Sequence, residues 1–170
     1  MLRRFFAKLR ATRRDPTRDW PRASISAPSV DCARRAVGEL RFGDSLSAAR
    51  CFGRPDAFRW TQPGYCELLY AGAGFQIDFD SGRFAYAAFF VAEDEHAPRV
   101  SFSTPRVDSI QLSRETSFEQ IEAAFGRPVS RDRDDDETIL FYARRDIAIE
   151  FEVSSPGLLK RVNVYPTSKL

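Results

Sequence analysis

The feature that most constrains the fold of this chain is an internal repeat. The tetrapeptide Phe-Gly-Arg-Pro occurs at 52–55 and again at 125–128, 73 positions later. The pattern of apolar and acidic residues that follows the first copy, at 64–80, also returns after the second copy, at 136–152. Because such a repeat indicates one structural unit used twice, the sequence predicts two copies of the same supersecondary structure.

Each copy has the pattern of a short helix that ends at the tetrapeptide. Ser45 or Asp44 can cap a helix over 44–52, and Ser117 with the glutamine three residues later fits a capping box for 117–125. The glycine then supplies a left-handed residue at the helix C-terminus, and the proline prevents continuation. The repeated tetrapeptide therefore predicts a helix end that occurs twice.

Strands of alternating character follow each predicted helix. At 75–80 and at 147–152, apolar residues alternate with polar or acidic ones. This pattern indicates antiparallel strands that are buried on one side only. Turns at 80–83 and 154–157 then lead to return strands. The predicted fold class is α+β: two tandem repeats, each with a short strand, one helix and a three-stranded antiparallel meander, with the helices packed on one face of the sheet.

These units divide the chain into three segments. Residues 1–39 form a basic N-terminal leader and linker in which a helix can form, residues 40–98 the first repeat, and residues 99–170 the second. The two repeats are expected to share one compact domain, because 170 residues fall within the usual range for a single domain.

The leader carries most of the positive charge of the chain. Residues 1–22 hold eight basic and two acidic side chains, whereas the whole chain has a formal net charge of only +2. At helical spacing the apolar residues share one face, which suits an anionic membrane surface. The candidate membrane-contacting residues are Phe5, Phe6, Leu9, Arg3, Arg4 and Lys8.

Three other interpretations of the leader stay open: docking on the chain's own domain, a frayed terminus, or an organellar transit peptide. An export signal is not expected, because the longest apolar run in the leader is Phe5-Phe6. The expected location is the cytoplasm, with peripheral contact to the inner membrane surface through residues 1–14 as a further option.

Candidate catalytic groups are few. The three cysteines form no CxxC pair, and the one histidine, His96, lies in a polar segment, so a cysteine–histidine enzyme is disfavoured. The acidic run at 134–137 could form a weak metal loop, and strand carboxylates could serve as an acid–base pair or bind Mg²⁺. Acidic residues on an exposed strand face are more often solvated surface. We therefore expect no enzymatic activity, no cofactor and no metal.

A short capped helix ending in Phe-Gly-Arg-Pro, followed by strands with an aromatic residue in the first, occurs twice over about residues 40–166. This arrangement resembles the β-lactamase-inhibitor-protein architecture and is similar to the small outer-membrane assembly lipoproteins. Those families are exported and carry disulfides or a lipidated cysteine, whereas this sequence shows no export signal and no such cysteine, so a cytosolic variant is expected here. It also implies a fold whose helix-free sheet surface binds other proteins.

The expected function is therefore a protein-binding module, an intracellular inhibitor or immunity-type protein whose partner is a toxin or an enzyme with a basic patch. The small net charge gives no reason to expect a nucleic-acid partner. The alternative function is a membrane-surface or envelope-associated scaffold that uses the leader. A small enzyme is the least favoured of the three functions. The candidate partner-binding residues are four strand acids and two aromatic residues of the preceding loop: Asp78, Asp80, Glu150, Glu152, Trp60 and Tyr65.

Overall fold

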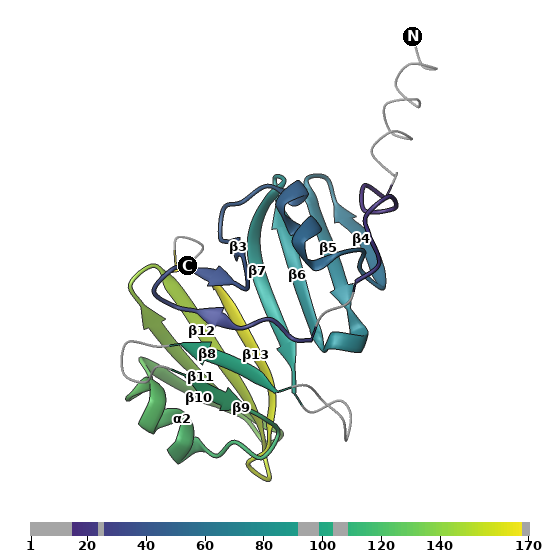
Figure 1. Cartoon of the computed structure of the whole chain (residues 1–170). Coiled ribbons are helices and arrows are strands. Elements are labelled where there is room, and N and C mark those ends of the chain that lie inside the picture. The colour runs from purple at the N-terminus through teal and green to yellow at the C-terminus, as the bar shows by residue number, and fades with distance from the viewer. Residues whose placement is uncertain (1–14, 24–25, 92–98, 104–108, 168–170) are drawn as a thin grey trace.

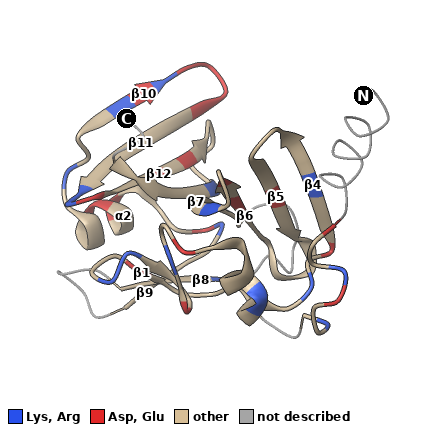
Figure 2. Ribbon diagram, turned by 90° about the horizontal axis from the view of Figure 1, so that it is seen from above, with Lys and Arg blue, Asp and Glu red and all other residues tan. Residues whose placement is uncertain are grey.

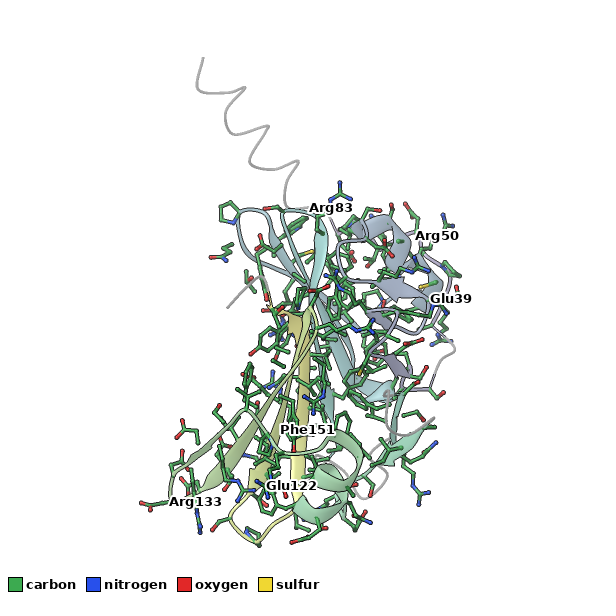
Figure 3. All side chains as sticks on the ribbon, turned by 90° about the vertical axis from the view of Figure 1, so that its left-hand side faces the viewer. Glu39, Arg50, Arg83, Glu122, Arg133 and Phe151 are labelled. Carbon is green, nitrogen blue, oxygen red and sulfur yellow. The ribbon has the colours of Figure 1, made fainter. Side chains whose placement is uncertain are left out.

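The computed structural model of the chain describes residues 15–23, 26–91, 99–103 and 109–167 (Figure 1). The candidate membrane-contacting residues of the leader and His96 lie outside these ranges. About half of the described residues form two β-sheets, which lie face to face as two layers (Figures 1 and 3).

The larger sheet has eight antiparallel strands in the order β10-β11-β12-β13-β7-β6-β5-β4. At its centre β7 pairs with β13, and Ala87 lies opposite Val164, so the two runs of consecutive strands join into one continuous sheet. The strands are β4 (Ala57–Gln62), β5 (Tyr65–Tyr70), β6 (Phe75–Asp80), β7 (Arg83–Phe90), β10 (Ser130–Arg133), β11 (Glu137–Arg144), β12 (Ile147–Ser154) and β13 (Leu159–Pro166).

The smaller sheet has five strands in the order β3-β2-β1-β8-β9 and lies across one face of the larger sheet (Figure 1). β1 and β8 run parallel, with Val30 opposite Phe102, and the other pairs are antiparallel. Residues 30–37, expected in the leader and linker, supply two of these strands. The strands are β1 (Val30–Asp31), β2 (Ala36–Val37), β3 (Leu40–Arg41), β8 (Val100–Ser103) and β9 (Ile110–Leu112).

Two of the three described helices end at the repeated tetrapeptide. The α-helix α2 (Phe118–Phe125) begins with the predicted capping box, in which the Ser117 hydroxyl accepts from the Gln120 N–H and the Gln120 side chain accepts from the Ser117 N–H. η1 (Leu46–Phe52) is instead a 3₁₀-helix, and Ser45 makes no side-chain cap hydrogen bond. A third, η2 (Ala71–Ala73), is a single 3₁₀ turn between β5 and β6.

The glycine of the tetrapeptide is not in the left-handed helical conformation expected for it. Gly53 has φ 78° and ψ −172°, and Gly126 has φ 77° and ψ −164°. This extended conformation with positive φ is open almost only to glycine. A Cβ atom on Gly53 would also lie 2.7 Å from the Cα of Ala23. The first tetrapeptide therefore ends a helix and holds the N-terminal segment, since Arg54 N–H donates to Pro21 O at 2.6 Å.

The core lies between the two sheets and is built largely from phenylalanine. Phe102 of β8 contacts rings from the larger sheet and from α2, with centroids 6.3 Å from Phe89, 5.7 Å from Phe125 and 6.4 Å from Phe151. All four side chains are buried, and one hydrophobic cluster includes residues from both sheets and both longer helices. Figure 3 shows the layers from the side, with Phe151 labelled.

The predicted fold class of two helix-and-meander repeats is wrong. The described residues form a mostly β structure with a second sheet that the prediction lacks. The strands β1 and β2 are two residues long, too short for alternating hydrophobicity to reveal them, whereas β3 and β9 lie where the short strand before each helix is predicted. β4 and β10 also escape prediction, because both are edge strands with mostly exposed residues; β10 has no apolar face, and the aromatic residues of β4 stand in a polar stretch typical of a loop.

Candidate functional site

One face of the larger sheet faces away from the smaller sheet and from η1 and α2, and we call it the open face (Figure 3). The strand acids reach this face because their neighbours in the alternating pattern, such as Ile77 and Phe151, are buried in the core. Asp78 and Asp80 come from β6, whereas Glu150 and Glu152 come from β12. β7 and β13 lie between the two acidic pairs.

The strands between these acids carry a hydrogen-bonded network. The Tyr86 hydroxyl donates to Asn163 Oδ1 at 2.7 Å and accepts from Arg161 Nη2 at 3.0 Å. Asn163 Nδ2 in turn donates to Glu152 Oε1 at 2.6 Å. These contacts connect β7, β13 and β12, so each side chain is held in one orientation.

A second tyrosine extends the network to the other predicted acid of β12. The Tyr165 hydroxyl donates to Glu150 Oε1 at 2.7 Å, and its ring stacks on that of Tyr86 with centroids 6.1 Å apart. Burial raises the pKa of Tyr86 to about 12, although the nearby Arg161 guanidinium opposes that rise. Both hydroxyls therefore stay protonated at neutral pH and act as hydrogen-bond donors.

Asp78 is buried rather than exposed, with 4% of its surface accessible. It accepts from the Tyr65 hydroxyl at 2.7 Å and from Gln76 Nε2 at 2.8 Å. Burial raises the pKa of the Asp78 carboxyl, and the two hydrogen bonds oppose this shift only in part. Asp78 therefore orients the Tyr65 side chain and presents little charge to solvent.

The two aromatic residues predicted as partner-binding lie on different faces of the sheet. Tyr65 lies opposite Asp80 on the open face. Trp60 lies opposite the buried Cys66 and so belongs to the other face, where its ring meets Phe58 edge-on with centroids 5.3 Å apart. The structure therefore groups Tyr65 with the four acids and separates Trp60, which is 41% exposed on the edge strand β4.

A hollow of about 610 Å³ lies at one end of the open face. It borders the network, since Glu152 and Arg161 belong to both, and the turn between β12 and β13 forms one wall. The lining residues are Phe90, Arg114, Glu152, Ser154, Pro156, Leu158, Lys160 and Arg161.

Sequence reasoning misses the centre of this site. Arg161, Asn163 and Tyr165 alternate along β13 with the buried Val162 and Val164, which is the signal that could have found them. The acids of β6 and β12 stand out in the sequence by their charge, whereas β13 carries uncharged hydrogen-bonding side chains and one arginine on this face.

The described residues offer little for nucleophilic or metal chemistry. Burial raises the pKa of Cys32 to about 11 and of Cys66 to about 12, so both thiols are protonated at neutral pH. No group of three or more candidate metal ligands occurs within the described ranges. No helix in the described part of the chain is long and apolar enough to cross a membrane.

No protein-family model matches the chain, and no curated protein matches it. Among solved structures it is similar to YjgB of Bacillus subtilis, a DUF4309 family protein, with 12% identity and a TM-score of 0.53 over 77% of this chain and 84% of that one. A cysteine-rich secretory protein of Staphylococcus aureus, SAV1118, has 13% identity and a TM-score of 0.37 over 88% of this chain and 53% of that one.

The likeness to the Bacillus protein shows a shared β-rich fold and nothing about activity. It also corrects the resemblance drawn from the repeated helix-and-strand pattern, because the structure whose fold this chain shares is a DUF4309 family protein and not a β-lactamase inhibitor protein or an assembly lipoprotein. A short helix followed by Gly-Arg-Pro and a meander is a local pattern that more than one fold can contain.

Proposed function

We propose that this chain is a protein-binding module whose partner docks on the open face. The observation that carries the proposal is the network across β7, β13 and β12, in which tyrosine, asparagine and arginine side chains are fixed on a sheet face that no described element covers. Interface energy is concentrated in tyrosine, tryptophan and arginine, so Tyr86, Tyr165 and Arg161 are suitable anchors.

The network also lowers the entropic cost of binding. Ordering a flexible side chain at an interface costs about 0.5–1.5 kcal/mol, and a side chain already held by hydrogen bonds avoids part of that cost. Tyr86, Tyr165 and Arg161 are half-buried in the chain alone, each with at least one hydroxyl or guanidinium contact. A face that served solubility alone would not need tyrosine hydroxyls bound to carboxylates.

Electrostatics adds a preference for a basic patch on the partner. Asp80, Glu150 and Glu152 are half-buried on the open face and retain contact with solvent, whereas Asp78 is buried. Charge attraction across such a face mainly speeds association and weakens as salt screens it. An inhibitor or immunity role would be a special case of this function. The membrane-surface scaffold remains the alternative, and it rests on leader residues outside the described ranges.

The test compares variants of the open face with a matched variant on the opposite side. Tyr165→Ala removes an anchor, Asp80→Lys reverses a charge, and Glu119→Lys makes the same reversal at an exposed position on α2. A partner captured from native lysate is purified, and its binding to each variant is measured as Kd and as on-rate against salt.

We expect Tyr165→Ala to weaken binding by about tenfold or more, equivalent to about 1.4 kcal/mol. Asp80→Lys should lower the on-rate and its salt dependence, and Glu119→Lys should leave both unchanged. Equal affinity for all three variants contradicts the proposal. Loss of binding with Trp60→Ala but not with Tyr165→Ala would move the site to the β4 edge.

A further inference from the structure

The hollow at the end of the open face differs in charge from the acidic positions of β6. Three cationic side chains line it, namely Arg114, Lys160 and Arg161, against the single carboxylate of Glu152. The open face therefore has the solvent-contacting acid Asp80 on β6 and a basic hollow beside the β12–β13 turn. The alternation of acidic and apolar residues in the strands does not reveal the basic hollow, because one of its cations, Arg114, comes from the loop before α2.

The three cations are neutralised to different degrees. Lys160 Nζ lies 2.6 Å from Glu137 Oε2 in an ion pair. Arg161 Nε lies 3.9 Å from Glu152 Oε1, too far for a hydrogen bond. This nitrogen atom makes no hydrogen bond with any described residue. The Arg114 side chain makes no ion pair with any described residue, although its backbone carbonyl accepts from Leu159 N–H at 3.0 Å. Arg114 is therefore anchored by its backbone and keeps its charge available to a ligand.

The remaining walls of the hollow are apolar. Phe90, Pro156 and Leu158 line it, and the Arg161 guanidinium carbon lies 5.3 Å from the centre of the Phe90 ring. Such a cation–π contact holds the guanidinium against an apolar surface, where water competes less with a ligand anion. Cations beside apolar walls suit a carboxylate carried on an aliphatic stem and flanked by an apolar residue.

We propose that the hollow receives an acidic side chain of the protein partner, a glutamate or aspartate next to an apolar residue. The inference rests on the proposed function and adds the chemistry that the partner must present. A partner with a basic patch over Asp80 and an acidic side chain in the hollow can dock in one orientation only. If the partner docked in the reversed orientation, like charges would face each other both at Asp80 and at the hollow.

The probe is a tripeptide, acetyl-Leu-Glu-Phe-amide, and the matched neutral probe is acetyl-Leu-Gln-Phe-amide. Each is titrated into the full ¹⁵N-labelled chain while amide shifts are followed by NMR. The variant is Arg114→Ala, which lies outside the network of the open face. The control is Arg133→Ala, an exposed arginine on the edge strand β10 that does not line the hollow (Figures 2 and 3).

We expect saturable shifts at Leu158, Lys160 and Arg161 with the glutamate probe, and binding of the glutamine probe weaker by about tenfold. Arg114→Ala should weaken glutamate-probe binding by a similar factor, and Arg133→Ala should not. No saturable shift, shifts elsewhere on the chain, or equal binding of both probes overturns the inference. Tyr165 does not line the hollow, so the Tyr165→Ala experiment tests partner docking independently of it. A failed peptide titration therefore leaves the proposed function standing, and a failure of the proposed function shows in the Tyr165→Ala experiment instead.

Discussion

At the residue scale, Asp78 makes stability depend on pH in an unusual direction. Burial raises its pKa in the folded chain above the ordinary value near 3.9, so the folded state binds the proton more tightly than the unfolded state. Stability should therefore fall as pH rises from about 4 through the raised pKa. Glu67, opposite Asp78 on β5, acts in the same direction because burial also raises its pKa.

Asp78→Asn should remove most of this fall while keeping the hydrogen bond from Tyr65. The measurement is the urea midpoint of wild type and variant across pH 4 to 7. Glu119→Gln is the control with the opposite sign, because a hydrogen bond from Ser117 lowers the pKa of Glu119, and its stabilisation is lost as pH falls. Parallel pH profiles of the midpoint for wild type and Asp78→Asn would contradict the assignment.

Phe125 is a core residue at which truncation of the side chain should lower the free energy of unfolding by a predictable amount. It is 1% exposed, and its ring contacts Phe102, Tyr142 and Phe151 with centroids 5.7, 5.8 and 4.9 Å away. Phe125→Ala should lower the free energy of unfolding by about 3–5 kcal/mol, as at other core phenylalanines. Phe118→Ala, at a half-buried position of the same helix, should cost less. Equal losses in chemical denaturation would mean that the helix face is misassigned.

The same residues show how far sequence reasoning reaches at the site. Period-two alternation puts Asp78, Asp80, Glu150 and Glu152 on the side of the sheet opposite the core, and the structure has them there. Alternation does not predict that Asp78 is covered, because burial depends on Tyr65 from the neighbouring strand. Nor does it predict the face of Trp60, since a polar stretch around an aromatic residue fits an edge strand as well as a loop.

At the scale of elements, the two helices that end in Phe-Gly-Arg-Pro offer a matched pair of caps. Ser117 completes a capping box on α2, whereas Ser45 precedes η1 without a side-chain cap hydrogen bond. Ser117→Ala should lower the free energy of unfolding by about 1 kcal/mol, and Ser45→Ala by much less. Urea denaturation of the two variants measures the difference. An equal loss of unfolding free energy in the two variants would show that the capping hydrogen bonds of Ser117 do not stabilise the chain.

Element length and burial decide which parts of the fold the sequence predicts. The six-residue strand β6 is predicted with its observed bounds, and the eight-residue strand β12 is predicted from its first residue and extends two residues beyond the predicted end. The two-residue strands β1 and β2 hold their place by pairing and by core contacts such as that of Val30, and nothing in their own sequence marks them. Their existence follows from the packing of the whole chain.

At the scale of the molecule, the two sheets should unfold as one unit. A single cluster of buried residues includes side chains of both sheets, and Phe102 of the smaller sheet meets Phe89 and Phe151 of the larger one. Domains with one shared core usually unfold in an all-or-none transition. Far-ultraviolet circular dichroism, which follows the strands, and fluorescence of Trp20 and Trp60 should therefore give the same urea midpoint.

The variant that tests this coupling is Phe102→Ala, which removes the ring between the layers. Because this ring of the smaller sheet contacts the larger sheet, its loss should lower the free energy of unfolding by about 3–5 kcal/mol and shift both signals together. Gly43→Ala, at a positive-φ position with no heavy atom within 4 Å of an added Cβ, is the control for destabilisation unrelated to the interface. It should also shift both signals together. Two separated transitions in wild type, or in Phe102→Ala alone, would show that the layers fold independently and that the smaller sheet is a separable cover.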